Sequence, residues 1–190
     1  MKRTNLILLA FLFFSCNDIQ KNNAADNHTD SHADSIEIKN LLQKVYKWHE
    51  TNNGRFDDFP VIVKDSFQVG IDMQQVLSAM SKMSQTNFFT GDFLKNYERT
   101  GEETDSTLKH GKYYNEINFD FQESEPWTFF QDDAGNYYDS LIIHDLAIHA
   151  DSASLKWTIK DMTDEDGYLV KLKHENNGWK ITSLAGFDRK

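Results

Sequence analysis

Cysteine is almost absent from this chain of 190 residues, because Cys16 is its only one. A single cysteine forms no internal disulfide and supplies no cysteine-based zinc site, and its acylation would also exclude thiol catalysis. Stability must then come from the packing of apolar side chains. The fourteen Phe, seven Tyr and four Trp residues supply large groups for such a core.

Basic residues are also scarce, since 20 Lys and Arg stand against 30 Asp and Glu and give a formal net charge of −10. Binding to nucleic acid needs clustered Lys and Arg, so the composition argues against nucleic acid as a partner. The same balance argues against attachment to anionic lipid by charge alone. It favours a basic protein as a binding partner.

A long apolar run occurs only at the start of the chain. Lys2 and Arg3 precede the apolar run Leu6–Phe14, which is too short to span a bilayer as a helix. Ser15, a small residue, then stands directly before Cys16. This order predicts a lipoprotein signal peptide over residues 1–15, with a lipidated Cys16 as the first residue of the mature chain.

Lipid on Cys16 would hold the protein in a bacterial cell envelope, either at the periplasmic face or in the outer membrane. Phe13 and Phe14 occupy positions where such signals prefer Leu and a small residue. An ordinary secretory signal with an incidental cysteine therefore remains the alternative interpretation.

The rest of the chain divides into a tether and one domain. Residues 16–34 are polar and contain almost no apolar residue after Ile19, which predicts a flexible tether. Residues 35–190 are predicted to form a single domain. An apolar stripe from Ile38 to His49, with steps of three and four residues, predicts a helix that begins at Asp34 or Ser35 and ends at 52–54.

Two further helices are predicted before residue 110. Asp72 is a plausible N-cap for the first of them, and the second is expected to start near Thr86, with Gly91 and Asp92 able to break it. The strongly polar stretch Glu98–Lys109 is expected to be solvated or frayed. Residues 55–70 are interrupted by Pro60 and are interpreted as an ordered connection.

The last fifty residues predict an antiparallel meander. Four stretches are rich in β-branched and aromatic residues or alternate between apolar and polar side chains, and 176–178 reads Asn-Asn-Gly, a hairpin turn signal. The stretches are Ser140–His149, Ala153–Ile159, Tyr168–Lys173 and Trp179–Ser183. Helices followed by a meander predict an α+β domain in which N-terminal helices pack on a curved antiparallel sheet.

This order of elements resembles the nuclear transport factor 2-like fold over residues 36–187. The motifs that carry the resemblance are Phe-Asp-Phe at 119–121, Gln-Asp at 131–132 and Gly-Trp-Lys-Ile at 178–181. The chain is more narrowly similar to uncharacterised envelope lipoproteins of Bacteroidota. The resemblance implies a cone between helix and sheet that serves as a ligand pocket, a dimer surface or an active site, and a related group resembles immunity proteins that block toxins.

Enzymes of that fold place an Asp–His or Tyr–Asp pair in the cone, and the resemblance therefore implies candidates here. The residues considered for the pocket or for partner contacts are His49, Asp120, Trp127, Asp145 and Trp157, with His144 and Tyr113 as further members. His144 and Asp145 are neighbours, so in a strand at most one of them faces the cone. No residue is assigned a catalytic role.

Two functions follow from this set. The first is a non-catalytic binding domain for a small apolar ligand or a protein partner, and the second is an isomerase or dehydratase with Asp120 or Asp145 as its base. No cofactor and no metal are expected, because the acidic loop 161–166 lacks the ligand spacing of a calcium-binding loop. A homodimer is left open.

Overall fold

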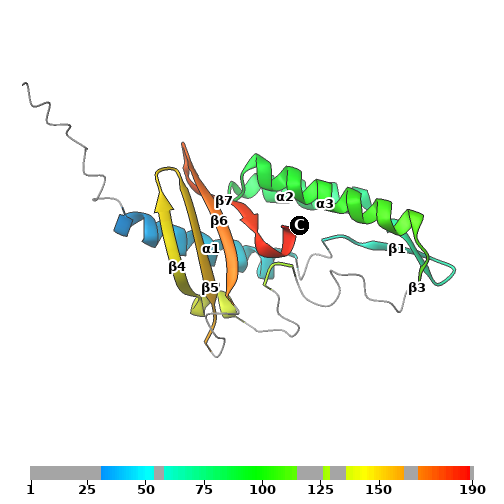
Figure 1. Ribbon diagram of the computed structural model, residues 1–190, viewed down its shortest axis with the longest axis horizontal. Coiled ribbons are helices and arrows are strands. Elements are labelled where there is room, and N and C mark those ends of the chain that lie inside the picture. The colour runs from blue at the N-terminus through cyan, green and yellow to red at the C-terminus, as the bar shows by residue number, and fades with distance from the viewer. Residues whose placement is uncertain (1–30, 54–57, 115–125, 129–135, 161–166, 189–190) are drawn as a thin grey trace, which may run out of the picture.

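The protein is described here by a computed structural model that covers residues 31–53, 58–114, 126–128, 136–160 and 167–188. It confirms the predicted α+β class, with helices packed on an antiparallel sheet (Figure 1). The predicted signal peptide and most of the predicted tether lie outside the described residues. The helices are α1 (Ser31–Asn53), α2 (Met73–Thr86) and α3 (Gly91–His110), and the short 3₁₀ turns are η2 (Tyr137–Ser140) and η4 (Ala185–Phe187).

The four-stranded sheet is the predicted meander, with strand order β4-β5-β6-β7. Its strands are β4 (Ile142–His149), β5 (Ser152–Thr158), β6 (Tyr168–Glu175) and β7 (Gly178–Leu184). Helix α1 crosses one face of this sheet (Figure 1) and buries the apolar stripe that the sequence predicts, including Ile38, Leu42 and Val45. The helix begins at Ser31, which is earlier than the predicted start at 34–35.

The N-terminal end of α1 is fastened to the β6–β7 hairpin. Trp179 donates its indole N–H to Asp34 Oδ1 at 2.9 Å, and its backbone N–H points to Glu37 Oε1 at 3.3 Å. A Cβ atom at Gly178 would lie 2.4 Å from that same Glu37 oxygen, and the φ angle of Gly178 is +108°. The turn glycine therefore both permits the hairpin conformation and leaves room for the helix.

A second, smaller sheet was not predicted. It has the order β1-β2-β3, with β1 (Val61–Lys64), β2 (Phe67–Ile71) and β3 (Tyr113–Tyr114), so the interpretation of 55–70 as a plain connection is wrong. Helices α2 and α3 pack against each other, and α3 packs along β2. This part of the molecule lies at the end opposite to the start of α1 (Figure 1).

Asp72 is the N-cap of α2, as predicted, and accepts hydrogen bonds from the backbone N–H groups of Gln74 and Gln75. The next helix begins at Gly91 with Thr90 as its N-cap, and not near Thr86. Between the two helices, Ile181 of β7 donates to the Phe88 carbonyl and accepts from the Thr90 N–H, each at 2.9 Å. The connection between α2 and α3 therefore pairs with the β7 edge of the larger sheet.

Helix α3 continues through the polar stretch that was expected to fray. Its buried residues there are Thr100, Gly101, Thr104 and Leu108. The two threonine hydroxyls donate to carbonyls four residues earlier, Thr100 to Asn96 and Thr104 to Thr100. A Cβ at Gly101 would lie 3.3 Å from Phe59 and from Val76. Small side chains thus let this part of the helix approach its neighbours closely, between the buried Tyr97 and the buried Leu108.

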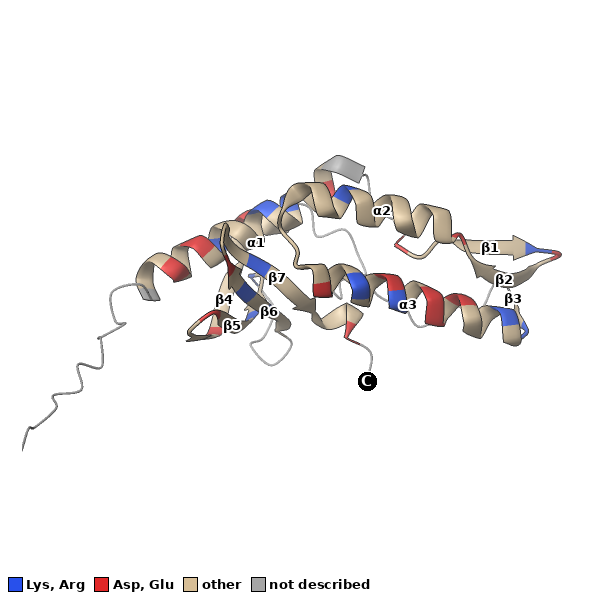
Figure 2. Ribbon diagram, turned by 90° about the horizontal axis from the view of Figure 1, so that it is seen from above, with Lys and Arg blue, Asp and Glu red and all other residues tan. Residues whose placement is uncertain are grey.

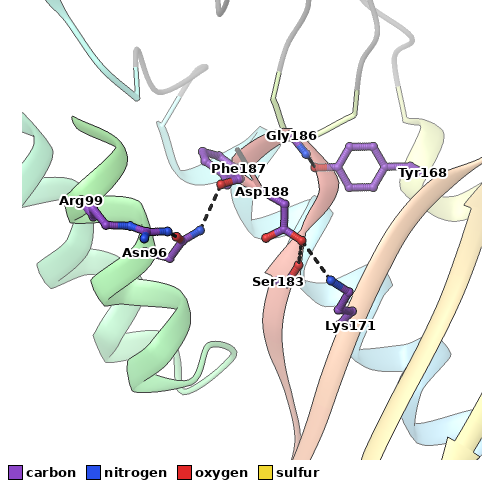
Figure 3. A network of polar contacts seen from close by, with 8 residues as sticks. All are labelled: Asn96, Arg99, Tyr168, Lys171, Ser183, Gly186, Phe187 and Asp188. Atoms are coloured by element: carbon purple, nitrogen blue, oxygen red, sulfur yellow. Dashed lines mark hydrogen bonds and ion pairs between the residues drawn. The ribbon is translucent and has the colours of Figure 1, made fainter. Parts of the chain in front are cut away.

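The C-terminal latch, residues 185–188, joins the two parts of the molecule. Phe187 is buried against Tyr97 of α3 and Trp127, with ring centroids 5.5 Å apart in each pair. Asn96 of α3 donates to the Phe187 carbonyl at 3.0 Å and itself accepts from Arg99 (Figure 3).

Polar contacts tie the latch to the larger sheet as well (Figure 3). Asp188 accepts hydrogen bonds from Ser183 at 2.6 Å and from Lys171 at 3.2 Å. Tyr168 accepts from the Gly186 N–H at 3.0 Å and donates to the Pro126 carbonyl. Burial raises the pKa of the Tyr168 hydroxyl well above its ordinary value, so the group keeps the proton that it donates.

We expect Gly186→Ala to destabilise the fold strongly. A Cβ at Gly186 would lie 1.9 Å from the Pro126 carbonyl oxygen, which is backbone and cannot rotate away. The backbone must shift to relieve this overlap, and the shift separates groups that pack against the latch. The free energy of unfolding, measured by urea denaturation, should therefore fall by about 2–4 kcal/mol.

Gly91→Ala is the matched control, because a Cβ there meets no atom within 4 Å. Gly91 is the first residue of α3, so alanine should leave the free energy of unfolding unchanged or raise it slightly. Equal effects of the two substitutions would contradict the close packing of the latch.

Candidate functional site

The carboxylate of Asp58 is the polar centre of the interior. Asp58 is buried, and its Oδ1 accepts the hydroxyl proton of Tyr97 at 2.8 Å while its Oδ2 accepts the indole N–H of Trp127 at 2.9 Å. The Tyr97 hydroxyl also lies 3.0 Å from the Asp58 carbonyl. A buried carboxylate is costly unless donors satisfy its oxygens, and these two side chains do so.

His49 lies beside this centre. Its imidazole is fully buried and stacks on the Trp127 indole, with ring centroids 4.3 Å apart and an angle of 27° between the planes. Burial lowers the pKa of His49 from 6.5 to about 3, so the ring is neutral at physiological pH. Although Glu50 Oε1 lies 3.8 Å from Nδ1, its charge does not offset the loss of solvation.

Aromatic side chains from α3 and its preceding turn enclose Trp127. Phe89 meets the indole edge-to-face at 5.9 Å, and Phe93 lies at 6.5 Å. Together with Phe187 of the latch, these rings isolate the Asp58–Trp127 hydrogen bond from solvent. The described side chains around His49 and Asp58 are thus arranged for packing and for mutual hydrogen bonds.

A second aromatic cluster lies under α1. The indole N–H of Trp157 donates to the Tyr46 hydroxyl at 2.9 Å, and Tyr137 stacks on Trp157 with centroids 6.0 Å apart. Tyr168 completes the cluster at 5.6 Å from Trp157. Trp157 is therefore buried between α1 and the sheet.

The structure brings together His49 and Trp127 among the residues selected from the sequence, and it places the others elsewhere. Asp120 lies outside the described residues. Asp145 is exposed, in a bulge of β4 where its φ angle is +50°, and His144 bonds to Thr158 at 2.7 Å.

Asp58 was missed by the sequence analysis, since it belongs to a run without periodicity, and only its place just before Phe59 and Pro60 hinted at burial.

A surface cleft at the end of the molecule opposite to the start of α1 is the better candidate for binding. We call it the distal cleft; it has a volume of about 510 Å³ and lies between the β1–β2 hairpin and the C-terminal end of α3. Its wall includes the apolar residues Phe67, Val69 and Leu108. Its remaining lining residues are Lys64, Asp65, Gln68, Lys109, Gly111 and Lys112.

Asp105 fixes one side of the distal cleft. It accepts the Ile71 N–H of β2 at 2.9 Å and the Lys109 ammonium at 2.5 Å. Burial alone would raise the pKa of Asp105, but these donors lower it below the usual range. The carboxylate therefore keeps its charge and holds Lys109 on the helix, while Lys64 and Lys112 add two more positive charges to the cleft.

Within the described parts of the chain, no group of three His, Cys, Asp or Glu side chains is arranged to hold a metal ion. No described helix is long and apolar enough to cross a membrane. Comparison with protein-family models, with curated proteins and with solved structures gave no match.

We expect the free energy of unfolding to decrease as the pH is lowered from 6.5, because of His49. The folded protein binds this proton only near pH 3, whereas the unfolded chain binds it near pH 6.5, so stability is full above pH 6.5 and is lost as the pH falls. The loss is at most about 1.4 kcal/mol per pH unit between these two values.

His49→Leu should remove this contribution, and urea denaturation between pH 7 and pH 4 measures it. His110→Gln is the control, because His110 is exposed at the end of α3 and should leave the slope as it is in the parent chain. An unchanged slope in the His49 variant would contradict burial of the neutral ring.

Proposed function

We propose that this protein is a non-catalytic binding domain held in the bacterial envelope by lipid on Cys16. Its ligand is a small molecule with an apolar body and a negatively charged group, and it binds in the distal cleft. The observation that carries the proposal is the composition of that cleft, in which an apolar wall stands beside three lysines and one aspartate. Asp105 pairs with Lys109, so Lys64 and Lys112 are the lysines that would attract an anion. The volume of about 510 Å³ suits a small ligand.

The position of the cleft supports this function. Helix α1, which follows the predicted tether, begins at the opposite end of the molecule (Figure 1). A ligand from the surroundings would therefore reach the cleft without passing the anchored end. The resemblance to nuclear transport factor 2-like domains stays a prediction, and the proposed site lies at the second sheet and not in a cone.

A protein partner is the second candidate, favoured by the β1–β2 hairpin itself. Ile62, Val63 and Val69 are 47%, 45% and 36% exposed, and they are half of the six large apolar residues found exposed in the described part of the chain. Exposed apolar residues on an edge strand are typical of a docking surface. The immunity-like interpretation would place its toxin partner here.

The enzyme hypothesis retains less support from the described residues. Asp145 is exposed in its bulge, and the buried Asp58 is engaged by Tyr97 and Trp127. A catalytic base would need a dry pocket that substrate can enter.

We expect Cys16→Ser to release the protein from the membrane. The thiol accepts the lipid, and the acidic surface gives little attraction to anionic headgroups. Cell fractionation should find the parent chain with membranes and the variant in the soluble fraction, and mass spectrometry should find lipid on the parent alone. An unmodified parent chain, cleaved elsewhere, would instead support ordinary secretion.

We expect the chain from residue 16, carrying Cys16→Ser, to bind 8-anilinonaphthalene-1-sulfonate, an apolar dye with one negative charge. Lys112→Glu should weaken binding of the dye about five-fold. The substitution replaces an attractive charge by a repulsive one, which costs about 1 kcal/mol of binding free energy in total. Dye fluorescence measures the affinity, and a long-chain fatty acid should displace the dye.

Lys39→Glu makes the same charge change on the exposed surface of α1 and is the control. The dye should bind this variant as it binds the parent chain. Equal weakening by both variants would show that net charge, and not the distal cleft, governs binding. Displacement by a peptide from a partner but not by fatty acid would favour the second candidate.

A further inference from the structure

The open face of the four-stranded sheet differs in charge from the rest of the chain. Strands β5 and β6 bury Ala153, Leu155, Tyr168, Val170 and Leu172 beneath α1. Because side chains alternate along a strand, the residues between them face the other way. Lys156, Lys171 and Lys173 are among the residues that alternate with the buried ones. Figure 2 shows Lys or Arg positions on the sheet and several acidic positions along α3.

Strand register brings these residues into one patch. Ser154 of β5 is paired with Lys171 of β6, and Ser152 is paired with Lys173. The two lysines are two residues apart on one strand, which separates their Cα atoms by about 6.6 Å. Two lysines and two serines thus occupy neighbouring positions on one face of the sheet.

Bulges on both outer strands accompany this patch. The pairing of β6 with β7 shifts between Lys171 and Leu172 and leaves Thr182 as an extra residue. The pairing of β4 with β5 shifts between His144 and Ala147. Bulges bend strands and redirect side chains, and they are frequent next to functional sites.

A groove of about 430 Å³ follows the patch across all four strands. Polar and charged residues predominate in its lining, which consists of His149, Asp151, Ser152, Ala153, Ser154, Lys171, Leu172, Lys173 and Thr182. Asp188 of the latch lies 3.2 Å from Lys171 and neutralises part of its charge. No salt bridge is found for Lys173 among the described residues.

We propose that this sheet groove is a second binding site, for a soluble compound that carries at least two phosphate groups. Ammonium groups bind phosphate as point charges, and the serine and threonine hydroxyls can donate to its further oxygens. A compound with two linked phosphates offers an anionic group to each of the two lysines. This site is independent of the distal cleft and of the function proposed for it.

Calorimetric titration of the full chain, processed by its host and purified in non-ionic detergent, tests the proposal with inorganic tripolyphosphate as the probe. Tripolyphosphate should bind at least ten-fold more tightly than orthophosphate, because it engages both lysines. Lys171→Gln combined with Lys173→Gln should weaken tripolyphosphate binding at least ten-fold. Asp188→Asn should strengthen it about three-fold, because Lys171 then keeps its full charge.

Lys39→Gln, on α1, is the control and should leave the affinity for tripolyphosphate unchanged. Circular dichroism of each variant shows whether it is folded, and the gain expected for Asp188→Asn cannot come from unfolding. The proposal is overturned if the control loses as much affinity as the double variant, or if Asp188→Asn changes nothing. It is equally overturned if phosphatidylglycerol vesicles bind at this face while tripolyphosphate does not.

Discussion

The burial of one carboxylate organises the interior of this protein. Asp58 stands just before β1, and its two oxygens receive a hydroxyl from α3 and an indole N–H from the 126–128 segment. Removing either donor would leave a buried charge incompletely satisfied, so the three elements must be positioned together. His49 of α1 then stacks on the Trp127 indole, and Phe187 packs against it from the C-terminus. Five segments of the chain thus meet at the hydrogen bond between Asp58 and Trp127.

This arrangement changes where function is to be sought. The residues with the chemistry most suggestive of catalysis are those that hold the fold together, and burial keeps His49 in its neutral form. The surface features lie instead at the distal cleft and on the open sheet face. Both contain lysines together with carboxylates, on a chain of net charge −10.

Periodicity predicted the elements that bury a regular apolar face. The α1 stripe and the alternation in β5 and β6 were readable because one side of each is in contact with the core. The first half of α3 was readable from Phe93 and Tyr97, but its continuation was not, since the buried side there is mostly Thr100, Gly101 and Thr104. The β1–β2 hairpin was missed because Asp65 and Ser66 form its turn with positive φ angles, where a sequence reading expects Asn or Gly.

The candidate site was harder to predict than the fold. His49 and Trp127 were selected for their chemistry, and they do meet, but their contact serves packing. Asp58 could not be selected, because nothing in its local sequence shows that Tyr97 and Trp127 approach it. Long-range polar contacts of this kind depend on the assembled fold and leave no periodic trace.

The C-terminal latch has a consequence for the timing of folding. Phe187 fills the space beside Trp127 and Tyr97, yet it follows all the helices and strands that it packs against in the order of the chain. A nascent chain that still lacks the latch leaves those rings partly uncovered and one side of the core unfilled. The core is therefore complete only after the latch has been synthesised.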